Sequence, residues 1–464
     1  MGNPPNFTIF SLLSLVLLLS SQVSSSFTPT DHYLINCGST SPLTVDSDKR
    51  KFSGDESSLS DSVCLSASRT ISLSDSDTSD PLYNSARIFK KHSKYTFKIK
   101  EKGAHLVRLH FHRFDSSKFD LSDAQFHVLA DGYLLLNDFS GLTMKTIEIK
   151  EYILWVDSDK LEISFKPSKK SKFGFINAIE VISAPKDLIS DIAQVIDSNG
   201  VVKIDGISKN AYETMFRVNV GGVKVTPFND SLWRTWVTDD GFLESNQESK
   251  KVHFSGRIKY RMGGASREVA PDNVYNSARV ISASNSGVAK YELTWGFPIV
   301  DGYKYLVRFH FCDIASSVLG SLYFNVRVNG RMAIEDLDLS TITNSLASPY
   351  YADFVVSGEN GVITVSIGPS NSSSSSGVDA LLNGIEVFKM SNSMDSLDGM
   401  VSVRSIMKGC RGRTGGFLVP LVAAVGLLVA ASMVLRKRLM GARDSVAWSP
   451  LPVDVSEVSL KSSY

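Results

Sequence analysis

The sequence predicts an all-β protein that contains two tandem copies of one sandwich domain with a jelly-roll-like course. The first observation is a strand that occurs twice: HLVRLHFHRFDSS at residues 105–117 returns as YLVRFHFCDIASS at 305–317. In each copy apolar and polar residues alternate, which is the period expected when one face of a strand is buried. The second observation is a succession of short alternating segments with no amphipathic helix between them. Together they indicate a duplicated β-sandwich.

The duplication covers a whole domain, because other paired segments keep the same order on either side of that strand. The pairs are LYNSARIF and VYNSARVI (residues 82–89 and 274–281), FHVLADG and FNVRVNG (126–132 and 324–330), ISFKPS and VSIGPS (163–168 and 365–370), and NAIEV and NGIEV (177–181 and 383–387). A period this long indicates two globular domains and not a solenoid of short repeats. We therefore place domain one at residues 27–183 and domain two at 216–389.

The individual elements of domain one follow from the same alternation. Strands are expected at residues 95–99, 106–113, 124–130, 145–149, 161–165 and 177–182. The Ser- and Asp-rich stretch at 39–80 has few apolar residues, so we expect surface loop there. Residues 184–215 form the linker, and apolar residues near helical spacing at 188–196 favour a short helix within it.

The two ends of the chain carry targeting and membrane signals. Residues 1–26 have the form of a secretory signal, with an apolar run at 9–19 followed by small residues. The uncharged run at 415–435 is long enough, at about 1.5 Å per residue, to span a hydrocarbon core of about 30 Å. A polar stalk at 390–414 would precede it, and a short cytoplasmic tail at 436–464 would follow, which disfavours a GPI anchor. We expect a single-pass plasma-membrane protein with its N-terminus outside.

Composition and cysteine content restrict the partners and the compartment. The chain has a net charge of +1 and is 43% hydrophobic, so no overall charge favours binding to nucleic acid. Outside the cell, Cys37 and Cys64 are the natural disulfide pair. Cys312 is expected to be a buried small apolar residue, and Cys410 either a free thiol or a link between two chains.

Candidate modification and binding residues lie in loops. Asn229 (NDS) and Asn371 (NSS) are N-glycosylation sequons in turn-rich context. Trp233 and Trp236 lie close together and would suit stacking on a sugar or a protein hot spot if they were exposed. Packing in the core or against the linker is the favoured interpretation of both tryptophans.

The sequence carries no signature of an enzyme. It contains no GxSxG, HExxH, CxxC, P-loop, GxGxxG or kinase motif, so we assign no catalytic, cofactor-binding or metal-binding residue. His110, His112 and Asp115 could be imagined as metal ligands on one strand face. The second copy of the strand does not keep that set, so a polar strand face is the better interpretation.

The repeated segments also resemble a known family. RVNVGG, TPFNDSLWRTW, GGASREVAPDNVYNSAR, LVRFHFCDI and LLNGIEV are similar to the extracellular half of plant malectin-like receptor kinases of the FERONIA and THESEUS type, over roughly residues 27–435. The resemblance implies two malectin-like β-sandwich domains packed as a pair above one membrane helix. It also implies partners, since family members bind secreted cysteine-rich RALF peptides with GPI-anchored co-receptors, and pectin binding has been proposed.

These observations lead to one functional hypothesis and two alternatives. The hypothesis is a plasma-membrane receptor-like protein without its own kinase, which recognises RALF-type peptides or proteins at the cell wall and acts alone or with full-length receptor kinases. The first alternative is a full-length receptor serine/threonine kinase seen as a truncated gene model. The second is a lectin that binds cell-wall polysaccharide such as pectin.

Overall fold

The computed structural model describes residues 27–441 except 56–61, 68–69, 75–79, 115, 117, 142–145, 170–171, 198–199, 245–248, 262–263, 282–290, 371–377 and 409–417. Two compact units divide the chain, one up to Val403 and one from Arg404 onward. The predicted signal peptide and residues 442–464 of the predicted cytoplasmic tail, together with Asp115, Asn371 and Cys410, lie outside the described residues.

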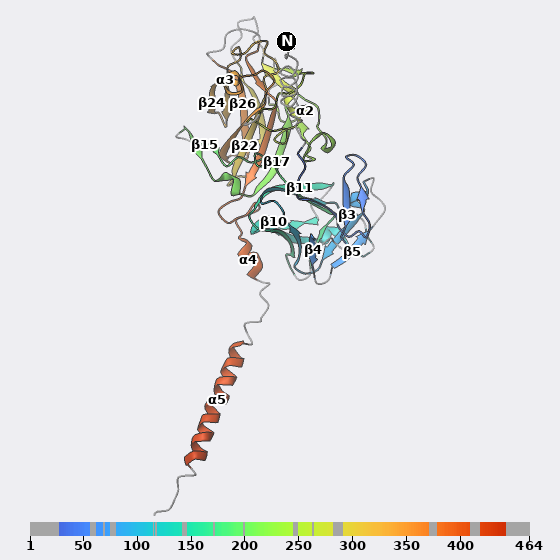
Figure 1. Cartoon of the computed structure of the whole chain (residues 1–464), viewed down its shortest axis with the longest axis vertical. Coiled ribbons are helices and arrows are strands. Elements are labelled where there is room, and N and C mark those ends of the chain that lie inside the picture. Colours follow the sequence, from blue (N-terminus) through green and yellow to red (C-terminus); the bar gives the residue numbers. More distant parts are fainter. Residues whose placement is uncertain are drawn as a thin grey trace, which may run out of the picture. The chain divides into compact units, whose positions relative to one another are not determined.

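The first unit contains two β lobes, and the first lobe runs from residue 32 to 183 (Figure 1). Its strands are β1 (His32–Asn36), β2 (Leu43–Thr44), β3 (Lys51–Gly54), β4 (Val63–Ser66), β5 (Thr70–Ser74), β6 (Ser85–Phe89), β7 (Ser93–Lys98), β8 (Gly103–Phe111), β9 (Gln125–Ala130), β10 (Tyr133–Ser140), β11 (Glu148–Val156), β12 (Lys160–Pro167), β13 (Gly174–Ile176) and β14 (Ala178–Ser183). Two 3-10 turns, η1 (Pro81–Tyr83) and η2 (Leu121–Asp123), complete it.

The second lobe runs from residue 212 to 390. Its strands are β17 (Tyr212–Asn219), β18 (Val237–Thr238), β19 (Ser249–His253), β20 (Ser277–Ile281), β21 (Leu293–Pro298), β22 (Lys304–Phe311), β23 (Phe324–Val328), β24 (Arg331–Leu337), β25 (Tyr350–Ser357), β26 (Val362–Pro369), β27 (Ala380–Leu382) and β28 (Gly384–Met390). Short helical turns are η5 (Pro227–Asn229), α2 (Asp272–Tyr275) and α3 (Leu339–Thr343). Between the lobes lie β15 (Ala193–Asp197), β16 (Gly200–Ile204) and η4 (Ile207–Lys209).

The two lobes share one strand order, which confirms the duplication. The first lobe has the order β11-β8-β14-β1 in its large sheet and the second has β25-β22-β28-β17. The facing sheets also correspond, as β10-β9-β12-β7 and β24-β23-β26-β21, and so do the small sheets β13-β6-β5 and β27-β20-β19. The repeated strands of the sequence are β8 and β22, and each lies inside its sheet.

Each lobe buries its own apolar core between facing sheets. Val107, Leu109 and Phe111 of β8 join a cluster with Phe126 of β9 and Phe165 of β12. In the second lobe, the corresponding residues of β22 pack in the same way against β23 and β26. Strands whose apolar residues alternate bury one face in this manner, so the all-β prediction is confirmed.

The lobes are joined by a shared sheet and a third core. β17 pairs with β11 through Tyr212 and Ile153, so the large sheets of both lobes form one sheet of 13 strands. A third apolar cluster contains Leu106, Ile153 and Phe52 of the first lobe with Leu306 and Phe388 of the second. The two lobes therefore form one body with a continuous core.

Three expectations for the connecting segments are wrong. The Ser- and Asp-rich stretch at 39–80 contains β2 to β5, and Phe52 in it is completely buried. The linker at 188–196 forms no helix. Its Ala193, Val195 and Asp197 belong to β15, which forms a hairpin with β16 and pairs with β25 on its other side. Finally, the strand expected at 145–149 begins only at Glu148 and continues to Val156.

The segment after β28 does not stand away from the lobes as a stalk would. The strap, residues 391–400, returns to both lobes: Leu134 of the first lobe forms a parallel bridge with Ser396. Asn137 N donates to Asp398 Oδ2 over 2.7 Å, and Gly399 N donates to Tyr303 Oη of the second lobe over 2.6 Å. Leu397 is completely buried in the core of the first lobe. The predicted stalk therefore begins with a docked segment.

The second unit is described by two helices. They are α4 (Val403–Met407), at the boundary of the units, and α5 (Leu418–Gly441), which overlaps the apolar run at 415–435. Among the described residues, no helix has the length and apolar character required to cross a bilayer. The membrane span at 415–435 stays a prediction.

Replacing Leu397 with alanine tests the strap. We expect L397A to lower the free energy of unfolding by about 2–5 kcal/mol, because the truncation leaves a cavity in the first-lobe core. Chemical denaturation of the purified chain measures the change. M394A is the matched control, since Met394 lies on the same segment with 38% of its surface exposed. Equal stability of L397A and M394A would show that the strap contributes nothing.

Candidate functional site

The polar faces of the two repeated strands are buried where the lobes meet. Arg108 and His110 of β8 are 4% and 2% exposed, and Arg308 and His310 of β22 are both completely buried. The polar strand faces expected from the sequence are therefore buried. Arg108 contacts the second lobe at Leu232, and Arg308 contacts Leu188 between the lobes. Buried arginines require partners, since an unpaired charge away from water costs several kcal/mol.

In the first lobe, Glu180 of β14 is the centre of the charged cluster. Its carboxylate accepts a hydrogen bond from Arg108 Nη1 over 2.8 Å and from Arg50 Nη1 over 2.7 Å. His110 Nε2 lies 2.9 Å from the other carboxylate oxygen, and Tyr83 Oη lies 2.9 Å from His110 Nδ1. Three side chains thus contact one carboxylate, and Tyr83 supports His110 from behind.

The second lobe repeats this arrangement around Glu386 of β28. Arg217 Nε donates to Glu386 Oε1 over 2.6 Å, and His310 Nε2 lies 3.1 Å from Oε2. Tyr275 Oη lies 3.1 Å from His310 Nδ1, as Tyr83 does beside His110. The tyrosine, histidine and glutamate are therefore a duplicated structural unit, while the arginine partners differ, since Arg308 makes its two close carboxylate contacts with Asp353 at 2.7 Å.

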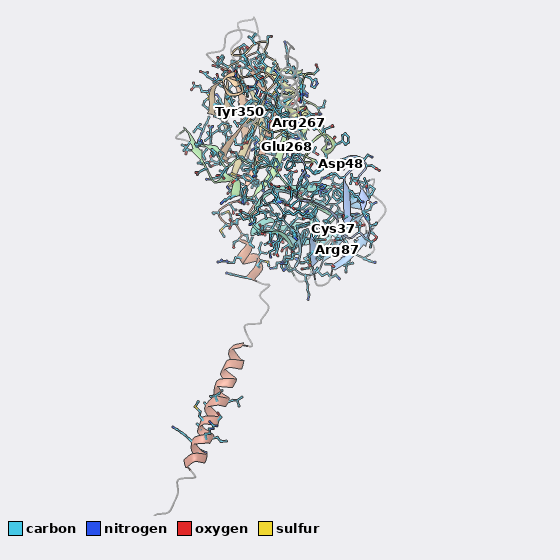
Figure 2. The ribbon with its side chains drawn as sticks, in the orientation of Figure 1. Cys37, Asp48, Arg87, Arg267, Glu268 and Tyr350 are labelled. Carbon is cyan, nitrogen blue, oxygen red and sulfur yellow. The ribbon has the colours of Figure 1, made fainter. Side chains whose placement is uncertain are left out.

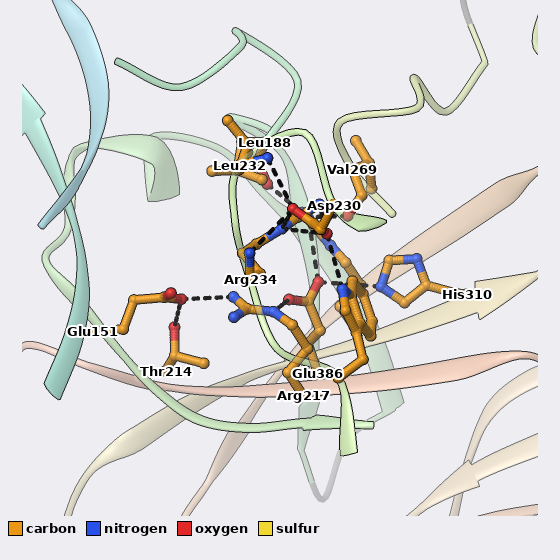
Figure 3. Close-up of polar contacts among 12 residues, drawn as sticks. Glu151, Leu188, Thr214, Arg217, Asp230, Leu232, Arg234, Val269, His310 and Glu386 are labelled. Atoms are coloured by element: carbon orange, nitrogen blue, oxygen red, sulfur yellow. Dashed lines mark hydrogen bonds and ion pairs between the residues drawn. The ribbon is translucent and has the colours of Figure 1, made fainter. Parts of the chain in front are cut away.

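Glu151 of β11 connects the two clusters across the lobes (Figure 3). Its carboxylate accepts from Arg108 Nε over 2.6 Å, from Arg217 Nη2 over 2.8 Å and from Thr214 Oγ1 over 2.8 Å. Arg108 belongs to the first lobe, whereas Thr214 and Arg217 belong to the second. A chain of alternating charges, which we call the charged seam, thus runs Glu180–Arg108–Glu151–Arg217–Glu386.

Arg108 and Arg308, the arginines of the two repeated strands, each also donate a hydrogen bond to a backbone carbonyl outside their own lobe. Arg108 Nη2 donates to the carbonyl of Leu232 in the second lobe over 2.8 Å. Arg308 Nη1 donates to the carbonyl of Leu188, which follows the first lobe, over 2.6 Å. Each repeated strand therefore binds a backbone segment that lies outside its own lobe.

The charged seam keeps its carboxylates ionised. Burial by itself would raise the pKa of Glu151, but the guanidinium groups of Arg217 and Arg108 outweigh it and lower that pKa to about 2. Burial likewise opposes ionisation of Glu180 and Glu386, and the neighbouring arginines and histidines hold both pKa values well below the usual range. Through the Glu151–Arg217 ion pair, the charged seam is an electrostatic contact that holds the two lobes together.

The two tryptophans proposed as ligand contacts serve the same interface. Trp236 is completely buried, and its Nε1 donates to Asp230 over 3.0 Å. Trp233 is half-buried and stacks on His32 of the first lobe, with ring centroids 4.8 Å apart. The packing interpretation holds for both residues, and neither presents a free face for sugar stacking in this structure.

Arg234 fixes the loop that carries these tryptophans. Its guanidinium binds Asp230, with Nε and Oδ1 2.9 Å apart, and donates to the carbonyls of Val269 and Glu268. The neighbouring segment is further held by the Arg267–Asp272 ion pair. Internal hydrogen bonds and ion pairs thus hold the described residues of 264–280 in place.

The predicted disulfide between Cys37 and Cys64 is absent, because both thiols are free. Cys37 lies in the first-lobe core, near the buried Asp55–Arg87 ion pair (Figure 2), and burial raises the pKa of its thiol well above the ordinary value. Cys64 alternates with the buried Val63 on β4 and is exposed. Cys37 thus lies in the core next to the large sheet, whereas Cys64 lies on the exposed face of the five-stranded sheet. Cys312 is completely buried and free, as expected.

Two pockets accompany the β15–β16 hairpin. One, of about 780 Å³, is lined by residues that include Ile192, Gln194, Val201, Lys203 and Tyr350. Of these residues, Tyr350 is labelled in Figure 2. The other, of about 470 Å³, lies where the end of β15 meets the β23–β24 and β25–β26 turns. In the part of the chain that the structure describes, no group of three metal-ligating side chains is assembled.

The sequence contained a signal for the charged seam that the motif search missed. Glu180 and Glu386 are the shared glutamates of NAIEV and NGIEV, and they recur beside the shared arginine and histidine of β8 and β22. When an apolar strand carries the same charged residue in both copies of a repeat, that residue is expected to form a buried ion pair. Glu151 also has an acidic counterpart, Asp353, opposite the arginine of the second copy. Arg217 has none, since Leu34 holds its position in the first copy. Its role is therefore visible only in the structure.

Replacing Glu151 with glutamine tests the charged seam. We expect E151Q to lower the free energy of unfolding by about 3–5 kcal/mol, because Arg108 and Arg217 then lose their shared counter-charge. E148Q is the matched control on the same strand, and it should cost less than about 1 kcal/mol because Glu148 is partly exposed. Urea denaturation near neutral pH measures both variants.

The pH dependence of E151Q supplies an independent readout. The folded-state pKa of Glu151 is about 2, below its ordinary 4.5, so its stabilisation is present above pH 4.5 and is lost as the pH falls toward 2. The stability difference between wild type and E151Q should shrink over that interval. A stability difference that stays constant with pH would contradict an ionised Glu151 in the charged seam.

The comparisons with known proteins agree with this geometry. The malectin-like domain family matches residues 35–390. THESEUS 1, a receptor-like protein kinase of Arabidopsis thaliana, is 38% identical over 414 residues, which are 87% of this chain and 47% of that protein. HERK 1 of the same plant is 34% identical over 464 residues, covering 99% of this chain and 54% of that protein. The chain thus spans about half the length of these relatives.

Solved structures show the same fold. The extracellular domain of ANXUR1 from Arabidopsis thaliana superposes with a TM-score of 0.70 at 30% identity, covering 80% of this chain and 99% of that chain. The plant receptor FER, in a complex with the peptide RALF23 and LLG2, superposes with a TM-score of 0.68 at 29% identity over 81% of this chain and 99% of that chain. This chain belongs to the malectin-like family, and its relatives are plant receptor-like kinases of the FERONIA and THESEUS type.

Proposed function

We propose that this chain is the extracellular recognition part of a plant receptor-like protein and binds secreted RALF-type peptides together with a GPI-anchored co-receptor. The observation that carries the proposal is the likeness to FER, whose structure was solved in complex with RALF23 and LLG2. The similarity to FER extends over both lobes, so a binding surface formed by both lobes can be compared between the two proteins.

The interface between the lobes supports recognition by a preformed surface. A ligand that contacts two domains binds more tightly when their orientation is already fixed, because less conformational entropy is lost on binding. Here the shared sheet, the third apolar cluster and the charged seam all fix that orientation. The lobes correspond to the domains we propose at residues 27–183 and 216–389.

We further propose that the recognition part faces the cell wall and is tethered to the plasma membrane. The supporting features are the apolar run at residues 415–435 and the secretory signal at 1–26. The relatives are named receptor-like kinases, which favours a membrane location. Association with full-length receptor kinases is a compatible mode of action.

Glycosylation provides a test of exposure to the secretory pathway. Asn229 is exposed at the end of η5, and Asn371 is the second proposed acceptor. In plant-expressed protein, we expect N229Q to increase electrophoretic mobility relative to wild type, and enzymatic deglycosylation to abolish that difference. N276Q is the matched control, because Asn276 has no sequon. Identical mobility of N229Q and wild type before deglycosylation would exclude a glycan at this position.

Binding to RALF-type peptides tests the main proposal. The purified chain should retain one or more members of a RALF peptide panel, and a GPI-anchored co-receptor of the LLG type should increase the amount retained. Biolayer interferometry measures both. A scrambled peptide of equal composition controls for charge attraction. Absence of binding to every member, with and without co-receptor, would refute the proposed ligand class.

A further inference from the structure

We infer that the outer edge of β16, together with the adjoining pocket of about 780 Å³, binds an extended peptide of a partner protein by strand addition. The inference goes beyond the proposed function, because it concerns where a strand-forming peptide binds and holds whether or not that peptide is of the RALF type.

The first observation is the position of β16 in the fold. It is the terminal strand of the 13-stranded sheet and pairs with β15 on one side only. No other described strand pairs with its outer edge. In Figure 1 the hairpin labelled β15 lies at the margin of the second lobe. A terminal strand presents unpaired backbone donors and acceptors, which complement another extended backbone.

The register identifies the outward-facing backbone groups. Asp197 pairs with Gly200, with two residues between them, and such a closing pair exchanges hydrogen bonds within the hairpin. Hydrogen-bonded and non-hydrogen-bonded pairs then alternate along the ladder. The N–H and C=O groups of Val201 and Lys203 consequently point away from β15, toward the free edge.

The side chains of this edge are unusually apolar for an exposed strand. Val201 and Val202 are 40% and 54% exposed, and Ile192 beside them is 45% exposed. Natural edge strands are commonly protected by being short or by carrying charges and prolines. The opposite terminal strand of the same sheet, β2, follows that rule with only two residues. β16 has five residues and only Lys203 as a charged side chain.

The pocket lies on the same side as these outward-facing residues. Val201 and Lys203, which alternate with Val202, line it together with Gln194 and Tyr350. Lys203 and Gln194 are paired across the hairpin, so both point to one face of the sheet. Alternate side chains of an added strand would point to that face, where the half-buried Tyr350 and Tyr351 provide apolar walls.

The size of the edge favours a peptide over a second copy of this chain. Five strand residues extend about 17 Å at roughly 3.3 Å each. A stable dimer buries about 800 Å² per partner, which a strip of this length and one strand width does not supply. Strand addition of a peptide needs only the backbone ladder and side-chain contacts in an adjacent pocket. We therefore assign an extended peptide as the occupant.

The chemistry of the lining defines the peptide further. Asp353 lines the pocket but is occupied by Arg308. Asp187 also lines it and forms no salt bridge among the described residues. Its Oδ2 accepts a 3.2 Å hydrogen bond from Ser266 N, and the remaining lone pairs of the carboxylate can accept from a cationic side chain. We expect a peptide with β-branched or aromatic residues at alternate positions and a Lys or Arg that reaches Asp187.

Substitution of Val201 by proline distinguishes the contribution of the backbone hydrogen bond to peptide binding from that of the side chain. V201P removes the outward N–H but no hydrogen bond of the hairpin, whereas V201A keeps the N–H and removes only the side chain. A phage-displayed library of random linear peptides, selected on the purified 464-residue chain, supplies the probes. K203P repeats the backbone test, and the thermal unfolding midpoint of each variant verifies that it folds like wild type.

We expect the enriched peptides to bind V201P and K203P at least about tenfold more weakly than wild type, and V201A by a smaller factor, because the ladder hydrogen bonds are lost only with proline. Hydrogen exchange should show new protection of the Val201 and Lys203 amides on binding. Peptides that bind V201P as well as wild type, or a library that yields no enriched sequence, would overturn the inference.

Two further outcomes would overturn it in favour of another occupant. If the Val201 and Lys203 amides are already protected in the free chain at low concentration, the edge is covered by this chain itself. If light scattering shows a dimer that V201P dissociates, a second copy occupies the edge.

Discussion

The burial of charge between the lobes is the constraint on which the rest of the structure depends. Arg108 and Arg308 lie at the middle of the repeated strands, where they are removed from water. Two cations in such a place destabilise the fold unless carboxylates and carbonyls surround them. Glu151 and Glu180 surround Arg108 within the first lobe, and Asp353 and Glu386 surround Arg308 within the second. The Arg217–Glu151 ion pair and the hydrogen bond from Arg108 to the carbonyl of Leu232 cross between the lobes, so these two contacts require one orientation. The apolar contacts alone would tolerate small rotations that the hydrogen-bond geometry does not.

The duplication explains why the interface is partly symmetric. Each copy provides a strand with one face for its own sandwich and one face for the other lobe. The tyrosine–histidine–glutamate unit was retained in both copies. Glu151 and Asp353 are also equivalent, since each lies opposite the arginine of the repeated strand and binds its Nε. The copies differ at Arg217, which lies opposite Glu386 where Leu34 lies opposite Glu180. Arg217 binds Glu151 of the first lobe, so the ion pair between the lobes comes from a residue that the first copy does not match.

Much of the fold could be predicted from the sequence, and the candidate site could not. Alternation in β8 and β22 revealed a strand with one apolar face, because that pattern depends only on neighbours along the chain. Whether Arg108 faces water depends on Leu232 and Glu151, which are distant in sequence and carry no local pattern. Cys64 shows the same limit. The occurrence of two cysteines in the early part of domain one favoured a disulfide, but Cys64 belongs to β4, which pairs with β7 in the five-stranded sheet, while Cys37 follows β1 in the large sheet. The strap escaped prediction because its buried residue, Leu397, stands alone in a polar segment.

The strap also determines how the body responds to tension. Within the strap, Gly399 is attached to Tyr303 of the second lobe, while Asp398 and Leu397 are attached to the first lobe. A pull on the segment beyond residue 403 would therefore load both lobes through the strap before it reaches β28. Extraction of Leu397 would release slack of a few residues before β28 of the large sheet is strained.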